Sequence, residues 1–480
     1  MRRRWIRTAP ALALLAAIAA CARNPVTGER EFSLMSESQE IALGKQYHEE
    51  VLQQMQPYED PELQKYVQDI ANRLAAASHR PQLPWNFTVV DVAAVNAFAL
   101  PGGYIYMTRG IITYLNDEAE LAGVLGHEIG HVTARHAARQ YTRATGGQLG
   151  LIALGVFVPE ARPFGQLAEA GLSLLFLKYG RDDELQSDRL GIEYLAKTGW
   201  DANAVPDFLT TLARLNEESD RAGVPNWLST HPQPGDRVVE AREAIAKLGA
   251  GTGGRRNRDE YLRQVDGVIF GDNPEEGIVR DGEFVHPVLL FGVRFPADWP
   301  VNNSPAQVVS RDPKDNRLML LQLEQAQGSN VEQVAVAMMQ KRGLQLVEGR
   351  RGRVNGLEAF VGTYRGRMQD GGEVGVRGAH IVHGGRIFLL VGLTPANGYN
   401  ASVETFDRVI GTFRPITRGE AADIKPNRVR LYTVRPGDTW QSIAQRNGGI
   451  VPASTLAIIN DHAPGDPPRA GERIKIVVAG

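Results

Sequence analysis

Cysteine is almost absent from this sequence, which has one, Cys21, in 480 residues. A single cysteine cannot form an intramolecular disulfide or a cysteine-closed structural zinc site, so both are excluded, together with dithiol redox chemistry. The chain must instead be stabilised by its core. Its length and its 43% of hydrophobic residues make such a core feasible.

The sequence also lacks a strong excess of charge of one sign. Its formal net charge is -2, and no cluster of lysine and arginine interleaved with aromatic residues follows the N-terminal segment. A nucleic-acid-binding surface needs such a basic field. The composition therefore predicts globular domains with no nucleic-acid partner, and the length makes three domains ordinary.

The N-terminal hydrophobic run is too short to span a membrane. Arg2, Arg3 and Arg4 precede an apolar stretch, Ala9–Ala20, of about a dozen residues, whereas a spanning helix needs about 20. Ile18-Ala19-Ala20-Cys21 resembles the lipobox of a bacterial lipoprotein signal. The resemblance implies cleavage before Cys21, lipid attachment to it and, because Ala22 rather than aspartate follows, sorting to the outer membrane with the body in the periplasm. The alternative is an ordinary secretory peptide with an incidental cysteine.

The most informative motif is His127-Glu128-Ile129-Gly130-His131. Residues four apart share one face of a helix, so the two imidazoles can bind one zinc ion, and Glu128 between them is placed to act as a general base. Asn116 is the predicted helix cap. The buried face of the helix is predicted from its apolar residues, which are Leu121, Val124, Leu125, Ile129 and Val132.

A catalytic zinc site with two histidines needs a third protein ligand, and Glu184 is the best candidate. Asp188, four residues later, projects from the same side of a second helix and could hydrogen-bond one of the histidines from behind. His136 is predicted to point away from the pair as a solvated or salt-bridged residue. A chance HExxH sequence on a surface helix is the alternative to a metal site.

These residues resemble the family of zinc endopeptidases that includes HtpX, BepA and the CAAX prenyl proteases, in which an ExxxD helix supplies the third ligand. The resemblance covers roughly residues 24–248. It extends to three further blocks in the same order, which are Asn24-Pro25-Val26-Thr27-Gly28, Asn96-Ala97-Phe98-Ala99-Leu100-Pro101-Gly102-Gly103 and Ser229-Thr230-His231-Pro232.

The resemblance implies a mainly α-helical, zincin-like (gluzincin) domain with a small sheet and one Zn²⁺ per chain on His127, His131 and Glu184. It also implies one of two roles for His231, which either steadies the oxyanion or takes the fourth position of the metal and holds the enzyme off. The C-terminal half departs from BepA-like proteins, because it shows no repeat of tetratricopeptide length. Partner binding through such repeats is therefore not implied.

Asn96, Ala97 and Phe98 are candidate substrate contacts. They precede a Pro-Gly-Gly turn that leads into a predicted strand, Tyr104–Thr108, and a second strand is predicted at Phe87–Val92. An extended substrate can pair with an edge strand beside the metal of a zinc peptidase. A plain structural hairpin is the alternative interpretation.

The chain is predicted to be multidomain. Residues 1–20 form the signal, 21–248 the peptidase domain, 249–259 a glycine-rich linker, 260–415 an α+β domain of unknown role and 428–480 a small C-terminal module. Gln148–Leu177 is predicted to form buried or cleft-covering helices. The α+β domain is expected to have strands at Leu289–Phe295, Leu318–Leu323, Ala359–Tyr364 and Ile387–Leu393 and a helix at Val331–Lys341. Its histidines, His286, His380 and His383, are assigned no chemistry.

The C-terminal module resembles LysM, a strand, two helices and a strand that bind the glycan of peptidoglycan. The resemblance rests on Tyr432–Trp440, on Ser442-Ile443-Ala444 and on Gly471–Ile476. Trp440 after Thr439, where a leucine is common, and the absence of a closing proline depart from the pattern. A LysM-shaped packing module without glycan affinity is the alternative.

Together these features predict a membrane-anchored periplasmic zinc metalloendopeptidase that degrades misfolded or stalled envelope proteins. Its expected partners are unfolded protein substrates, the membrane through lipid on Cys21 and peptidoglycan through residues 428–480. Two alternatives stay open: a non-enzymatic, chaperone-like envelope assembly factor, and a hydrolase of peptidoglycan crosslinks.

Overall fold

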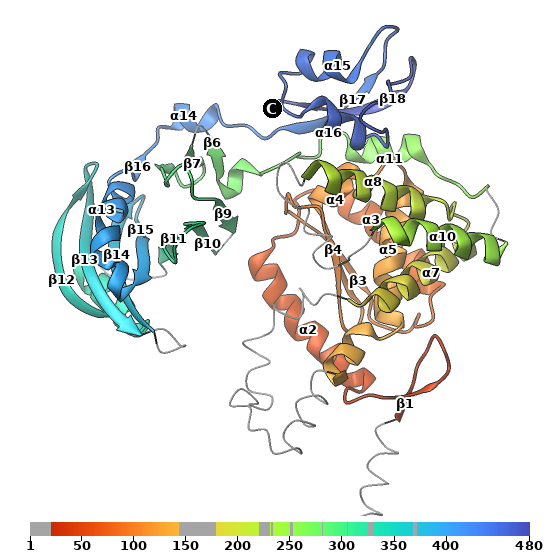
Figure 1. Cartoon of the computed structure of the whole chain (residues 1–480), viewed down its shortest axis with the longest axis horizontal. Coiled ribbons are helices and arrows are strands. Elements are labelled where there is room, and N and C mark those ends of the chain that lie inside the picture. Colours follow the sequence, from red (N-terminus) through yellow and green to blue (C-terminus); the bar gives the residue numbers. More distant parts are fainter. Residues whose placement is uncertain are drawn as a thin grey trace, which may run out of the picture. The chain divides into compact units, whose positions relative to one another are not determined.

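The computed structural model describes residues 21–143, 179–219, 231, 234–249, 253–280, 282–304, 306–324, 330–367 and 372–480 (Figure 1). The chain divides into two compact units, residues 1–271 with 427–480 and residues 272–426. The predicted signal, 1–20, and the helices predicted for Gln148–Leu177 lie outside the described residues. Among the helices that are described, none is both long enough and apolar enough to cross a membrane.

A three-stranded sheet lies at the centre of the first unit's larger part. It contains β3 (Asn86–Val90), β5 (Tyr104–Thr108) and β4 (Ala97–Leu100) in that order, with β3 parallel and β4 antiparallel to β5. The predicted Pro-Gly-Gly turn joins β4 to β5. Gly102 in this turn has φ +80°, and a Cβ there would lie 2.6 Å from Cα of Ile41, so only glycine fits. In the strand order β4 comes last and pairs with β5, so β4 is an edge strand of this sheet.

Helices surround this sheet, and a separate short hairpin precedes it. The elements are β1 (Cys21–Arg23), β2 (Arg30–Phe32), α2 (Glu37–Gln54), α3 (Pro61–Ala76), α4 (Arg109–Tyr114), α5 (Glu118–Thr133), α7 (Arg181–Thr198), α8 (Ala204–Ser219), α10 (Pro234–Leu248) and α11 (Arg258–Val265). Every residue of α5 is buried. Its cap is Asp117, whose carboxylate accepts a hydrogen bond from the Glu120 N–H at 2.9 Å, so the prediction of Asn116 as the cap is wrong.

Glycines allow α5 and α7 to approach each other at backbone distance. A Cβ on Gly191 of α7 would lie 3.1 Å from the backbone nitrogen of His127, and a Cβ on Gly130 of α5 would lie 3.1 Å from Cα of Ser187. Larger residues would push the two helices apart. This contact places the HExxH helix directly against the helix that carries Glu184.

The structure differs from the prediction of a flexible linker at 249–259. Arg256 forms ion pairs with Asp117 at 3.1 Å, Asp201 at 2.9 Å and Asp207 at 2.6 Å, and Arg255 lies over the Trp200 ring at 4.5 Å. These contacts fix the second half of the segment on the first unit. The boundary between the units falls instead at residues 271–272, because α11 also packs on the first unit.

The C-terminal module has the predicted order of elements. Antiparallel strands β17 (Arg428–Thr433) and β18 (Arg473–Val478) flank helices α15 (Trp440–Arg446) and α16 (Ala453–Ile458). The module has its own core around Trp440 and Ile443, but Ile458 belongs to the core of the peptidase part. It therefore folds as part of the first unit.

The second unit is an α+β structure, as predicted. Its antiparallel seven-stranded sheet contains β12 (Gln345–Val354), β13 (Leu357–Arg367), β14 (Glu373–His383), β15 (Arg386–Pro395), β11 (Leu318–Glu324), β10 (Gln307–Arg311) and β9 (Val301–Ser304) in that order. A four-stranded sheet contains β16 (Arg414–Pro415), β8 (Phe291–Val293), β7 (Glu283–His286) and β6 (Ile278–Arg280). Its helices include α12 (Val331–Lys341), α13 (Tyr399–Ile410) and the short α14 (Arg418–Ala422).

Candidate metal centre

Four side chains that are far apart in the sequence converge in the first unit. His127 and His131 come from α5, Glu184 comes from the first turn of α7, and His231 comes from the chain just before α10. One possible ligand atom from each lies within 4.8 Å of all the others, and all four side chains are buried. The spacing in the sequence predicted three of these as ligands, and the resemblance added His231.

The distances are those of groups that share one centre. The Nε2 atoms of His127 and His131 lie 3.0 Å apart, and Nδ1 of His231 lies 3.3 Å from Nε2 of His127. Glu184 Oε1 lies 2.9 Å from Nδ1 of His231 and 3.4 Å from Nε2 of His131. Three imidazoles and a carboxylate in this arrangement can bind a divalent metal ion.

Asp188 holds His127 from behind, in the place that the sequence predicted. Its Oδ1 accepts a hydrogen bond from Nδ1 of His127 at 2.8 Å. This contact puts the proton of the imidazole on Nδ1, so that Nε2 is unprotonated and faces the other ligands.

His136 performs the equivalent task for His131, so the prediction that it points away from the pair as a solvated residue is wrong. The predicted alternative of a salt-bridged residue has a counterpart in Asp183, whose Oδ1 lies 3.7 Å from Nε2 of His136. His136 is fully buried, and its Nδ1 lies 2.7 Å from Nδ1 of His131. With Nε2 of His131 unprotonated, Nδ1 of His131 donates to His136, whose Nε2 then donates to Gln186 at 3.1 Å. Burial lowers the pKa of His136 to about 4, which keeps this ring neutral, as an acceptor must be.

Sequence reasoning missed Arg237, a buried residue of α10. Its guanidinium donates to both carboxylate oxygens of Asp188 at 2.7 Å and pairs with Glu184 at 2.7 Å. Two buried carboxylates four residues apart do require a cation, and that signal was available. Nothing in the spacing, however, identified which arginine supplies it.

The local charges keep Glu184 ionised. Burial acts to raise its pKa, but the neighbouring His231 and Arg237 outweigh it and hold the pKa well below the usual value. Asp188 has a lowered pKa for the same reason, because Arg237 outweighs the effect of its burial. Both carboxylates are thus anions at neutral pH, the form that binds metal or a ligating histidine.

Glu128 is the unsatisfied group of the centre. It is fully buried, neither carboxylate oxygen has a hydrogen-bond partner among the described residues, and Oε1 lies 3.7 Å from Nε2 of His231. Burial raises its pKa. A buried carboxyl without partners beside three imidazoles fits a site that takes a metal ion and a water molecule.

Comparison of the sequence with known protein families finds two matches. Residues 61–245 match Peptidase family M48, and residues 432–477 match the LysM domain. The chain carries an M48 peptidase domain. All four converging side chains lie within it, and the match confirms both the resemblance drawn from the motifs and the metallopeptidase class of this segment.

Similar proteins share the M48 domain but not the whole chain. The beta-barrel assembly-enhancing protease of Yersinia pestis is 33% identical over 232 residues, 47% of this chain and 47% of that protein. The mitochondrial metalloendopeptidase OMA1 of Arabidopsis thaliana is 32% identical over 179 residues, 37% of this chain and 35% of that protein. This chain thus spans about half the length, or less, of these two relatives.

Among solved structures, PsbP from the cyanobacterium Synechocystis matches with a TM-score of 0.24 and 14% identity, over 28% of this chain and 91% of that chain.

Bacterial relatives and a LysM domain fit a protein of the cell envelope.

The predicted substrate contacts lie at and just before the edge strand β4 of the M48 domain, and the side chains of Ala97 and Phe98 are packed against other residues. Ala97 is buried in the main core, Phe98 stacks on Tyr106 at 4.8 Å, and the backbone of Asn96 bonds to Thr108. Hydrogen bonding alternates along an antiparallel pair, so after Asn96 the residues Phe98 and Leu100 bond to β5. The backbone groups of Ala97 and Ala99 therefore point away from β5, to the side on which no described strand pairs with β4.

Proposed function

We propose that this protein is a zinc metalloendopeptidase of the bacterial cell envelope that cleaves unfolded proteins. The observation that carries the proposal is the convergence of His127, His131 and Glu184 around one point, beside the carboxyl of Glu128, which has no hydrogen-bond partner among the described residues. His127, His131 and Glu184 would hold the ion. Zinc so bound lowers the pKa of a coordinated water toward neutrality and polarises a peptide carbonyl.

Glu128 supplies the proton transfer in this proposal. Its raised pKa suits a group that accepts a proton from water and returns it to the leaving amine. Asp188 and His136 orient the two histidines, and Arg237 pairs with Glu184 and Asp188. The open backbone of Ala97 and Ala99 would pair with an extended substrate beside the centre.

Glu128→Gln tests the catalytic role. The variant should retain zinc and lose cleavage by a factor of about 10² to 10⁴, the usual contribution of a general acid or base. Metal content and hydrolysis of unfolded casein are measured side by side for the two proteins. Glu193→Gln, on the half-buried outer side of α7, is the matched control and should retain activity. Unchanged proteolysis by Glu128→Gln would refute the proposal.

His231 is proposed to hold the site closed at rest. Its Nδ1 lies between Nε2 of His127 and Oε1 of Glu184, the place that a water or a substrate carbonyl would need. His231→Ala should therefore increase casein hydrolysis several-fold at unchanged zinc content. A decrease would instead assign His231 to the oxyanion, where such a donor contributes up to a few kcal/mol.

The finer address is also proposed: a lipid on Cys21 that anchors the chain at the periplasmic face of the outer membrane. Labelling with a palmitate analogue should mark the wild type and not Cys21→Ser.

Hydrolysis of peptidoglycan crosslinks is a second candidate, favoured by the LysM match. Incubation of the purified protein with sacculi, alongside casein, separates it from proteolysis. Activity of the Glu128→Gln protein in envelope assembly would favour the non-enzymatic assembly factor over both.

A further inference from the structure

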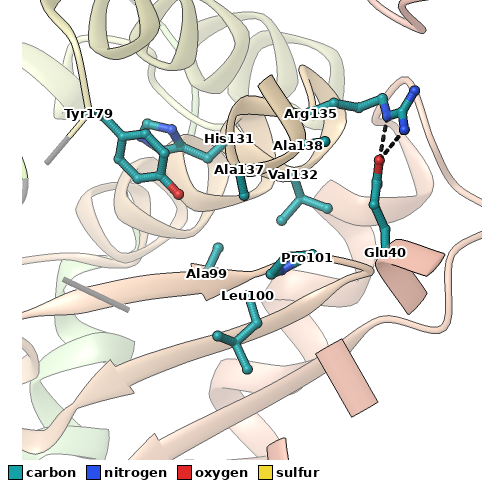
Figure 2. Close-up of a pocket in the computed structure, with 10 residues that line it drawn as sticks. All are labelled: Glu40, Ala99, Leu100, Pro101, His131, Val132, Arg135, Ala137, Ala138 and Tyr179. Carbon is teal, nitrogen blue, oxygen red and sulfur yellow. Dashed lines mark hydrogen bonds and ion pairs between the residues drawn. The ribbon is translucent and has the colours of Figure 1, made fainter. Parts of the chain in front are cut away.

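A small hollow lies beside the candidate metal centre, between α5 with the chain that follows it and strand β4. Figure 2 shows His131 and Tyr179 at one end, Ala99 of β4 on one side, and the Arg135–Glu40 pair at the other end. We call it the Ala99 pocket. One of its lining residues, His131, is a candidate metal ligand, so an occupant lies one side chain away from the candidate metal centre of the proposed peptidase, on which this inference rests.

The walls of the Ala99 pocket are apolar. Val132 and Ala138 present aliphatic groups from the helical side, and Ala99 presents its methyl group from the strand. The Tyr179 ring stacks on His131 with a centroid distance of 3.9 Å. A side chain that enters between these groups gains hydrophobic contact and finds few polar partners.

The charged end of the pocket is already satisfied. The Glu40 carboxylate is 2% exposed and accepts hydrogen bonds from Arg80 at 2.9 Å and from Arg135. A buried carboxylate with two guanidinium partners has no need of a further cation, and the two arginines likewise have their anion. The Arg135–Glu40 pair therefore forms one end of the pocket and does not favour a charged ligand there.

The pocket is small. It encloses about 250 Å³ including its open mouth, and its interior admits about one water-sized group beyond the lining atoms. A methyl group fits this space. A leucine or phenylalanine side chain would have to displace Val132 or the strand, at the cost of overpacking.

Ala99 connects the pocket to the open strand edge. Its backbone groups face away from β5, while its side chain lines the pocket next to His131. A peptide paired along this edge has side chains that alternate between two faces, so one of them is directed at the pocket. We propose that the Ala99 pocket receives a small apolar side chain, of alanine size, at a position next to the scissile bond, and thereby sets the cleavage specificity.

The test uses short unstructured peptides that differ only in one residue, with glycine, alanine, valine, leucine or phenylalanine at each position in turn. Products are identified by mass spectrometry after digestion by the full chain and by its His231→Ala variant. Cleavage with alanine next to the cut bond should exceed cleavage with leucine or phenylalanine about tenfold or more. Equal cleavage of all peptides would overturn the pocket and leave the peptidase intact.

A change of pocket size provides the second measurement. Val132→Ala enlarges the pocket and should move the preference toward valine or leucine by about tenfold. Val67→Ala is the matched control, because this buried residue of α3 loses the same atoms outside the pocket. Its preference should stay with alanine, and its zinc content and that of Val132→Ala should equal the wild type's. An unchanged preference in Val132→Ala would overturn the proposal.

Binding without turnover separates this proposal from the proposed function. Calorimetry of the zinc-loaded Glu128→Gln protein with the alanine and leucine peptides should give a Kd ratio of about tenfold in favour of alanine. A preference in binding without any cleavage by the wild type would retain the pocket and refute the peptidase. Equal affinities would refute the pocket whatever the wild type cleaves.

Discussion

At the scale of single residues, the molecule buries titratable groups in two different ways. Around the candidate metal centre Glu184 and Asp188 each have a partner of opposite charge, as Asp188 has in Arg237. His380 of β14 is the opposite case, because it is fully buried and neither ring nitrogen has a hydrogen-bond partner in the described part of the chain. Its neighbours across the sheet are Phe360 and Leu389. Only the first kind of burial tolerates charge.

His380 is expected to make the protein sensitive to acid. Burial, and secondarily Arg342, lowers its folded-state pKa to about 4, while an unfolded chain has about 6.5. Between these values the unfolded state binds the extra proton, so the free energy of unfolding falls as pH falls from about 6.5 to about 4. The loss at pH 5 relative to pH 7 is about 2 kcal/mol.

The measurement is urea unfolding of the full chain at pH 7 and pH 5. His380→Leu should reduce the pH dependence by this amount, since it removes the titrating ring. His383→Leu, on the same strand, is the control and should retain the wild-type pH dependence. If the free energy of unfolding of His380→Leu depended on pH as strongly as that of the wild type, His380 would not be the source of the acid sensitivity.

How well single residues could be predicted depended on whether a local rule governs them. The i, i+4 spacing on a helix was enough to pair His127 with His131 and Glu184 with Asp188, and the structure brings the two pairs together. The roles of His136 and Arg237 could not be predicted from the sequence, because they come from tertiary contacts. His136 lies in the chain after α5 and contacts His131, and Arg237 of α10 contacts Asp188 of α7. No periodicity records such contacts.

At the scale of elements, the approach of α5 to α7 determines the geometry of the centre. Gly126, Gly130 and Gly191 leave room for backbone contact between the helices, and the ligands project from the same contact. The distance between the helix axes thus sets the distance between Glu184 and the two imidazoles.

Gly191→Val should loosen the centre without touching any ligand. Its side chain would meet the backbone of His127 and Gly126, so the helices must separate, at a cost of about 1–3 kcal/mol in stability. Zinc affinity should fall with it, because the ligands move apart. Zinc titration with a competing chelator measures this fall. Ala196→Val, on the exposed face of α7, controls for a β-branched residue in the helix and should leave the affinity unchanged.

Elements with a strong local pattern were predicted closely. The helix predicted at Val331–Lys341 has those bounds, and the strand predicted at Tyr104–Thr108 does too. The strand β12 was missed because nearly all its side chains are exposed and carry no alternation, and α13 was missed between strand signals. Both depend on the neighbours they pack against.

At the scale of the whole molecule, the LysM domain and the M48 domain form one unit. Lys475 of β18 is fully buried, and its ammonium group donates to the carbonyls of Thr113, at 2.8 Å, and Leu115 at the end of α4. Asp461 beside α16 pairs with Arg214 of α8 at 3.1 Å. The LysM domain therefore packs on the end of α4, which leads into the HExxH helix, and on α8.

Lys475→Met should weaken the packing of the LysM domain on the M48 domain. It leaves two buried carbonyls unpaired, and the free energy of unfolding should fall by about 2–4 kcal/mol. Limited proteolysis of the native protein should then cut between residues 266 and 430, freeing the C-terminal fragment, and calorimetry should resolve an additional transition. Lys65→Met, on the exposed side of α3, should change neither. A single unfolding transition at the wild-type temperature in Lys475→Met would contradict the role of Lys475 in holding the LysM domain on the M48 domain.

The sequence predicted the fold of the LysM domain but not its attachment. Glycines at 249–254 indicated a linker, yet Arg256, which follows them, forms ion pairs with three aspartates from other parts of the first unit. Composition reports local flexibility, whereas a domain boundary depends on ion pairs between distant segments. The second unit therefore begins later, at residue 272, than its composition suggested.

The shortness of β4 has a consequence for what the protein can recognise. The strand has four residues, which span about 13 Å. In the proposed function a substrate pairs its backbone amides with this strand. A segment whose amides are already hydrogen-bonded within a folded structure cannot pair in this way, so the proposed peptidase would bind an unfolded protein and leave the same protein alone once it has folded.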